Sequence, residues 1–146
     1  MNSQETDSSV ALKQESNLKI VTQIHAIRHF IEKMDIEMID SFLDNDITYQ
    51  EMEKYLFISK LQQAFETFAG FGDTHLLSLE GSCNACDRTK SGFTFFGNNS
   101  RNYMSIIFDA KDKKIIDLYE CSDFKNRQGK LYLKNRIHID DSDVRF

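Results

Sequence analysis

Apolar residues recur along this chain at two different periods. From residue 17 to residue 73 they return every three or four positions, which places them on one side of an α-helix. From residue 74 to residue 139, short apolar runs alternate with turn-like segments, as expected for β-strands joined by tight links. The pattern predicts an α+β domain in which helices pack on one antiparallel sheet.

Three helices are predicted in the first part. One begins near Ser16 or Asn17, residues suited to capping a helix N-terminus. A short second helix ends at the polar cluster Asp44-Asn45-Asp46, and a third runs from about Gln50 to Ala69. Apolar residues cover so much of the third helix that we expect it to be largely buried. The apolar stripes of the first and third helices are Ile20, Ile24, Ile27, Ile31 and Met34, and Phe57, Leu61, Phe65 and Phe68.

The second part predicts a curved antiparallel sheet of four to six strands. The links between the strands are short, so neighbouring strands should pair as a meander. The predicted strands are about Thr74–Gly81, Gly92–Gly97, Tyr103–Phe108 and Lys114–Cys121, with a fifth near Lys130–Ile139. Residues 1–16 and 140–146 are expected to be loose polar tails, which leaves a single domain over residues 17–139.

Both faces of the predicted sheet carry apolar residues. Met104, Ile106 and Phe108 alternate with Tyr103 and Ile107 along one strand, and the next strand repeats the pattern. Helices can cover only one face of the sheet. The apolar residues on the other face therefore indicate that a second subunit covers it. We therefore expect a homodimer. The alternative is that the tails fold back over that face.

Charge is distributed unevenly along the chain. The net charge is −5, and residues 1–73 alone hold six basic and thirteen acidic residues, a balance of −7. Five basic residues gather between residues 125 and 136, which a solvated strand edge explains as well as a nucleic-acid site, so we do not expect nucleic-acid binding. No apolar run is long enough for a membrane span, and no secretory signal is evident at the N-terminus, so we expect a cytoplasmic protein.

The order of the elements resembles the nuclear-transport-factor-2-like (NTF2-like) superfamily, the cone-shaped α+β fold of ketosteroid isomerase and scytalone dehydratase. The stretch MIDSFLDNDITY looks like that family's early helix and first strand. KLQQAFETFAGFGDTHLLSLEG looks like its helix leading into the main sheet, and the meander through FTFFG and YMSIIFDAKDKKIIDLYECSDF looks like its remaining strands. The resemblance covers about Leu18 to Phe124. It implies a cone with an internal pocket, often in a dimer, but no particular chemistry and no catalytic residues.

Six residues are predicted to line such a pocket. His75 and Asp117 share strand faces with apolar neighbours, where either could act as an acid or a base. The alternatives are that His75 is a hydrogen-bonded core or rim histidine, and that Asp117 lies on the outer face and pairs with a Lys or Arg across a neighbouring strand. The full predicted set is Tyr49, His75, Phe93, Phe95, Asp117 and Tyr119.

Two cysteines have the spacing of half a zinc site. Cys83 and Cys86 lie in a turn-like loop, and the chain holds three cysteines in total. Because a structural zinc site needs four ligands, we favour an incidental role, with metal binding or redox chemistry as alternatives, and expect no cofactor and reduced thiols. His25 and His29 lie one helical turn apart, and surface positions explain them best.

These observations predict a small cytoplasmic binding module with an internal pocket for a small molecule. One alternative is an isomerase- or dehydratase-type enzyme that uses His75, Asp117 and Tyr119 as acid and base groups. The other is a protein-interaction domain whose pocket is filled by its own phenylalanines. Whether the chain is an enzyme stays open at this point.

Overall fold

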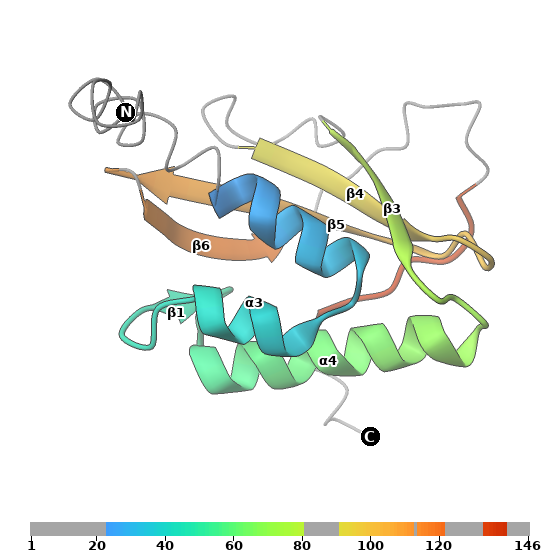
Figure 1. The fold of residues 1–146 in the computed structure, drawn as a ribbon, viewed down its shortest axis with the longest axis horizontal. Helices are drawn as coiled ribbons and strands as arrows, with labels where there is room; N and C mark the ends of the chain where they lie inside the picture. Colours follow the sequence, from blue (N-terminus) through green and yellow to red (C-terminus); the bar gives the residue numbers. More distant parts are fainter. Residues whose placement is uncertain (1–22, 81–90, 113, 122–132, 140–146) are drawn as a thin grey trace, which may run out of the picture.

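The computed structural model describes residues 23–80, 91–112, 114–121 and 133–139, and within them the fold is α+β, as predicted (Figure 1). Three helices are described: one over residues 23–32, α3 (Ile36–Phe42) and α4 (Lys54–Gly70). The main sheet is an antiparallel meander in the order β3-β4-β5-β6, which confirms the predicted pairing. A short hairpin joins α3 to α4. The strand bounds are β1 (Thr48–Tyr49), β2 (Met52–Glu53), β3 (Leu76–Glu80), β4 (Ser91–Gly97), β5 (Tyr103–Lys111) and β6 (Lys114–Glu120).

The helices cover one face of the main sheet. In Figure 1, α3 lies between the helix over residues 23–32 and α4. Arg28, in the helix over residues 23–32, places its guanidinium carbon 4.5 Å from the centre of the Phe93 ring on β4. The predicted apolar stripe of α4 is buried in the same core as Phe93 and Phe95. Burial of these stripes is the main force that holds the layers together.

The centre of the other face of the sheet is also buried within the single chain, whereas Leu77 on the edge strand β3 is 45% exposed. Ile107 is 0% exposed and Phe96 is 7% exposed, and the Thr94 hydroxyl lies 2.9 Å from that of Ser105. All four of these side chains lie on the face opposite Phe93 and Phe95, because side chains alternate along a strand. Among the described residues, those at the centre of this face are therefore buried without a second subunit.

The third helix begins later than the sequence indicated. Gln50 and Glu51 were expected in its first turn, but they have φ angles of 52° and 62° and form the turn of the β1–β2 hairpin. A left-handed backbone cannot continue into a right-handed helix, so α4 begins only at Lys54. At the other end, Gly70 is the last helical residue and Gly72 adopts φ 88°, as the predicted stop requires.

The fifth strand is reduced to a single contact in the described residues. Residues 133–139 run alongside the start of β5, with one parallel bridge between Tyr103 and Arg136. The Tyr103 amide donates to the Asn135 carbonyl at 3.0 Å, and the Ile137 amide donates to the Tyr103 carbonyl at 2.7 Å. This segment takes the place next to β5 that β6 leaves when it ends at Glu120. The predicted tails, 1–16 and 140–146, lie outside the described residues.

Candidate functional site

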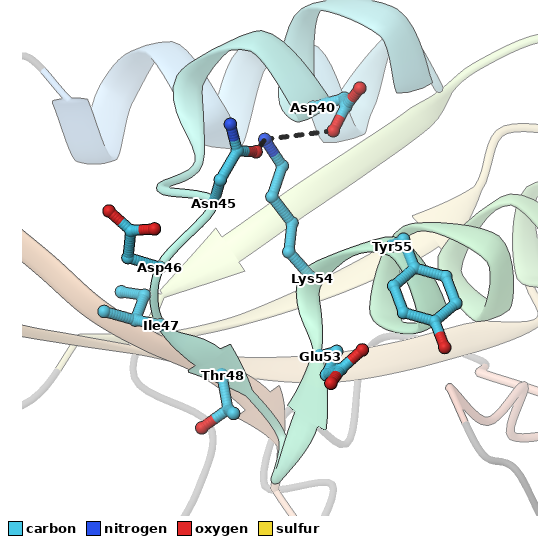
Figure 2. A pocket seen from close by; sticks show the side chains of 8 residues that line it. All are labelled: Asp40, Asn45, Asp46, Ile47, Thr48, Glu53, Lys54 and Tyr55. Carbon is cyan, nitrogen blue, oxygen red and sulfur yellow. Dashed lines mark hydrogen bonds and ion pairs between the residues drawn. The ribbon is translucent and has the colours of Figure 1, made fainter.

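A surface cleft of about 650 Å³ lies at the corner where α3, the β1–β2 hairpin and α4 meet. Its walls come from the end of α3, from the loop that leads to β1, and from the first residues of α4 (Figure 2). The side chains that line it are Asp40, Asn45, Asp46, Ile47, Thr48, Glu53, Lys54 and Tyr55. We call this feature the acidic cleft.

Lys54 is held within the acidic cleft by three oxygen atoms. Its ammonium nitrogen Nζ lies 2.9 Å from the Leu43 carbonyl oxygen, 2.7 Å from Asn45 Oδ1 and 3.1 Å from Asp40 Oδ1. Figure 2 shows the Lys54 side chain reaching across to Asn45 and Asp40. Only 11% of the Lys54 side chain is exposed, and its positive charge is paired with the Asp40 carboxylate.

Carboxylates dominate the rest of the lining. Asp40, Asp46 and Glu53 are all exposed, against the single positive charge of Lys54. Figure 2 shows Asp46 on the loop side of the cleft and Glu53 on the hairpin side. Tyr55 adds an aromatic ring that is 72% exposed. Negative charge beside an exposed aromatic ring favours a cationic group.

Local sequence explains how the cleft is shaped. The Asp44 carboxylate accepts a hydrogen bond from the Asp46 amide at 2.9 Å, a turn that Asp and Asn residues favour. Asp44 also pairs with Lys114, and this partner lowers the pKa of the Asp44 carboxyl. Across the hairpin Thr48 pairs with Glu53, which brings both side chains to the cleft wall.

None of the six predicted pocket residues lines the acidic cleft. Tyr49, Phe93 and Phe95 are buried in the core between the sheet and the helices. Their rings pack against others: Phe93 lies 5.1 Å from Phe108 and 6.3 Å from Phe95, and Tyr49 lies 5.8 Å from Phe57, between ring centres. Burial raises the pKa of the Tyr49 hydroxyl, which accepts a hydrogen bond from the Asp44 amide. These aromatic rings belong to the described hydrophobic core and not to the lining of the acidic cleft.

The predicted acid and base residues do not converge. His75 is exposed just before β3, whereas Asp117 and Tyr119 belong to β6 at the opposite edge of the sheet. Three strand spacings separate these edges, about 14 Å. The Asp117 carboxylate accepts a hydrogen bond from the Gln50 amide at 2.9 Å, so it helps to hold the hairpin. The arrangement does not favour a shared acid and base site for these three residues.

A second polar cluster surrounds Glu120 at the end of β6. Its carboxylate accepts from His138 Nδ1 at 2.9 Å and from the Ile139 amide, and lies 3.7 Å from the Arg136 guanidinium. Burial raises the pKa of Glu120, although its hydrogen bond with His138 acts in the opposite direction. Because each of these contacts joins β6 to residues 133–139, the cluster is best explained as structural.

The cysteine prediction falls mostly outside the described residues. Cys83 and Cys86 both lie there, so their metal and redox roles stay predictions. Cys121 is buried at the end of β6 and is disulfide-bonded, which contradicts the expectation of reduced thiols. Within the described part of the chain, no group of three or more His, Cys, Asp or Glu side chains is arranged to hold a metal ion.

The acidic cleft was not predicted from the sequence. The Asp44-Asn45-Asp46 cluster was interpreted only as the end of a helix, and Lys54 had no apparent role. The excess of acidic residues in the first half of the chain was the available signal, but charge alone cannot show which side chains meet. No helix in the described residues is both long enough and apolar enough to span a membrane. No family model, curated protein or solved structure matches this chain.

Proposed function

We propose that this chain is a non-catalytic binding module that recognises a positively charged group in the acidic cleft. The observation that carries the proposal is the charge of the lining: three exposed carboxylates face the cleft, and its one lysine is held by oxygen atoms of the protein. A cation that enters meets uncompensated negative charge. A ligand of this kind also fits the acidic balance of residues 1–73.

Two observations favour this site over the internal pocket expected from the NTF2-like resemblance. Aromatic rings pack closely in the described core, and the cleft at the surface already has the volume of a small-molecule site. The ligand is therefore proposed to bind at the corner of the fold. The NTF2-like relationship itself, a homodimer and a cytoplasmic location stay proposals that rest on the sequence.

The enzyme alternative has less support. A general acid and base pair must lie within hydrogen-bond reach of one bound substrate. His75, Asp117 and Tyr119 belong to opposite edges of the sheet, so they do not meet this requirement.

The proposal can be tested by titrating the ¹⁵N-labelled protein with spermidine and following its amide resonances by NMR. We expect saturable shifts in residues 40–55, weakening with added salt because the contacts are ionic. The dicarboxylate glutarate, at the same ionic strength, should leave these resonances unchanged. Shifts spread evenly over the acidic surface, or equal shifts with glutarate, would count against a defined site.

A charge-matched pair of variants makes the test specific. The double variant Asp46→Asn/Glu53→Gln removes two carboxylates from the cleft, and Glu37→Gln/Glu66→Gln removes two exposed carboxylates elsewhere. We expect the apparent Kd for spermidine to rise about fivefold or more in the first and to change less than about twofold in the second. Equal weakening in both variants would reduce the binding to non-specific charge attraction.

A further inference from the structure

The ammonium group of Lys54 sits in a complete set of hydrogen-bond acceptors. An ammonium carries three N–H donors, and Lys54 Nζ has three oxygen atoms within 3.1 Å. These oxygens belong to Asp40 on α3, to the main chain of Leu43 at the end of α3, and to Asn45 in the following loop. A carbonyl at the C-terminal end of a helix also carries partial negative charge, which favours a cation there.

We infer that these three oxygens form a site for a primary ammonium group, occupied by the protein's own Lys54, and that a ligand with such a group on an unbranched chain binds by replacing it. This inference rests on the function proposed above, because it specifies which cation the acidic cleft accepts. It makes Lys54 a built-in competitor. We call the three acceptors the ammonium site.

The geometry selects an ammonium over a guanidinium. The three acceptors converge on a single nitrogen atom at 2.7 to 3.1 Å. A guanidinium is planar and spreads five N–H donors over three nitrogens, so it cannot direct three of them at one point. A quaternary ammonium has no N–H donors at all. Lysine side chains and linear polyamines match the site, and arginine does not.

The site is also accessible to an incoming ligand. The Asp40 side chain is 55% exposed, and the contact between Lys54 and Asn45 is at the surface. An incoming primary ammonium would make the same three hydrogen bonds as Lys54, so the exchange leaves no acceptor of the site unpaired. A tethered group does compete at a high effective concentration, and removing Lys54 should therefore strengthen the binding of an external amine.

The decisive experiment uses Lys54→Ala with n-propylammonium chloride as the probe. The substitution deletes the Cγ, Cδ and Cε atoms and the ammonium, and propylammonium supplies the same atoms. We expect propylammonium to bind this variant about tenfold or more tighter than wild type and to raise its Tm. Tetramethylammonium, guanidinium at low concentration and sodium chloride at equal ionic strength serve as controls and should not do so.

Two further variants test the assignment of the acceptors. Lys54→Ala/Asp40→Asn should lose most of the gained propylammonium binding, because one charged acceptor is missing. Lys33→Ala removes an exposed lysine elsewhere and should behave like wild type. If Lys54→Ala does not bind propylammonium more tightly than wild type does, or if tetramethylammonium is equally effective, the inference is wrong.

A measurement on the wild-type protein keeps the inference testable even if Lys54→Ala does not fold. The ¹⁵N resonance of the Lys54 ammonium should be observable, since three hydrogen bonds slow the exchange of its protons with water. Addition of spermidine should abolish this resonance as Lys54 is displaced. If spermidine shifts residues 40–55 while the Lys54 signal persists, the proposed function stands and displacement is refuted. If spermidine causes no shifts in wild type but propylammonium binds Lys54→Ala, the ammonium site exists and the proposed function fails.

Discussion

At the scale of single residues, Asp73 shows how one buried carboxylate can hold a turn. It is 3% exposed and accepts hydrogen bonds from the Asn99 amide at 2.8 Å, the Ser100 amide at 2.7 Å and the Ser100 hydroxyl at 2.6 Å. These bonds connect the segment after α4 to the turn between β4 and β5. Gly97 lies directly against this carboxylate, and a Cβ atom added there would be 2.1 Å from Asp73 Oδ2.

Gly97→Ala should therefore be strongly destabilising. The new methyl group would push the Asp73 carboxylate away from its donors, and we expect the free energy of unfolding to fall by roughly 2–4 kcal/mol. Gly70→Ala is the matched control, because nothing lies within 4 Å of a Cβ atom at that position. It should be neutral or gain up to about 1 kcal/mol from higher helix propensity. Urea denaturation of both variants measures the difference; equal effects would refute the steric explanation.

Glu120 gives a prediction about pH. Burial raises its pKa above the usual value of 4.5, so the folded protein binds this proton more tightly than the unfolded chain does. Protonation of Glu120 stabilises the folded protein fully below pH 4.5, and this stabilisation is lost as the pH rises through the raised pKa. Relative to Glu120→Gln, which cannot ionise, wild type should become less stable as the pH rises above 4.5 and through the raised pKa. Asp44 titrates in both proteins, so its contribution cancels.

This prediction is checked by denaturation at several pH values in wild type and Glu120→Gln. A third variant, His138→Gln, removes the hydrogen bond that lowers the pKa of Glu120. It should therefore lose stability over a wider pH range than wild type does. A difference between wild type and Glu120→Gln that stays constant across this range would show that the carboxyl is not perturbed.

At the scale of elements, the β1–β2 hairpin depends on an unusual turn. Gln50 and Glu51 both have positive φ angles, a conformation that favours glycine and asparagine. Gln50 is held there by three contacts: its amide donates to Asp117, its side-chain oxygen accepts from the Glu120 amide at 2.8 Å, and its side-chain nitrogen donates to the Ile139 carbonyl. The surroundings fix this conformation, and the local sequence does not favour it.

Glu51→Gly should relieve part of this strain. Glu51 is exposed, so the substitution changes the backbone preference with little loss of packing. We expect a gain of about 0.5–1 kcal/mol in the free energy of unfolding. Glu66→Gly, at an exposed position within α4, should instead cost about 1 kcal/mol. Thermal denaturation compares the two, and a loss of stability in Glu51→Gly would mean that the turn is not strained.

The elements also show what the sequence could and could not predict. The strand order and the buried stripe of α4 follow from periodicity, because each depends on residues close together in the chain. The start of α4 at Lys54 does not, since it depends on Gln50 bonding with residues 67 and 89 positions away. The acidic cleft could not be predicted either, because it also depends on contacts that form only in the folded chain. Lys54 meets Asp40 and Asn45 only after the hairpin has turned the chain back.

At the scale of the whole molecule, burial of the outer sheet face bears on the oligomeric state. The homodimer was predicted because that face needed a cover, and Thr94, Phe96, Ser105 and Ile107 are already buried in one chain. The homodimer stays a prediction, but these residues supply no reason for it. Sedimentation equilibrium at micromolar concentration tests the homodimer, and a mass of 17.0 kDa, that of the monomer, would contradict it. A mass of twice this value would point to an interface elsewhere on the surface.

The place of Ile139 has a consequence for synthesis of the protein. Ile139 is fully buried in the core, and its carbonyl accepts from the side chain of Gln50, which is 89 residues earlier. A ribosome releases Gln50 long before it releases Ile139, so the helices and the meander emerge while one place in the core is still empty. The nascent domain therefore cannot reach its final stability until residue 139 has left the exit tunnel. Until then the start of β5 offers an open edge on which chaperones, or other nascent chains, can act.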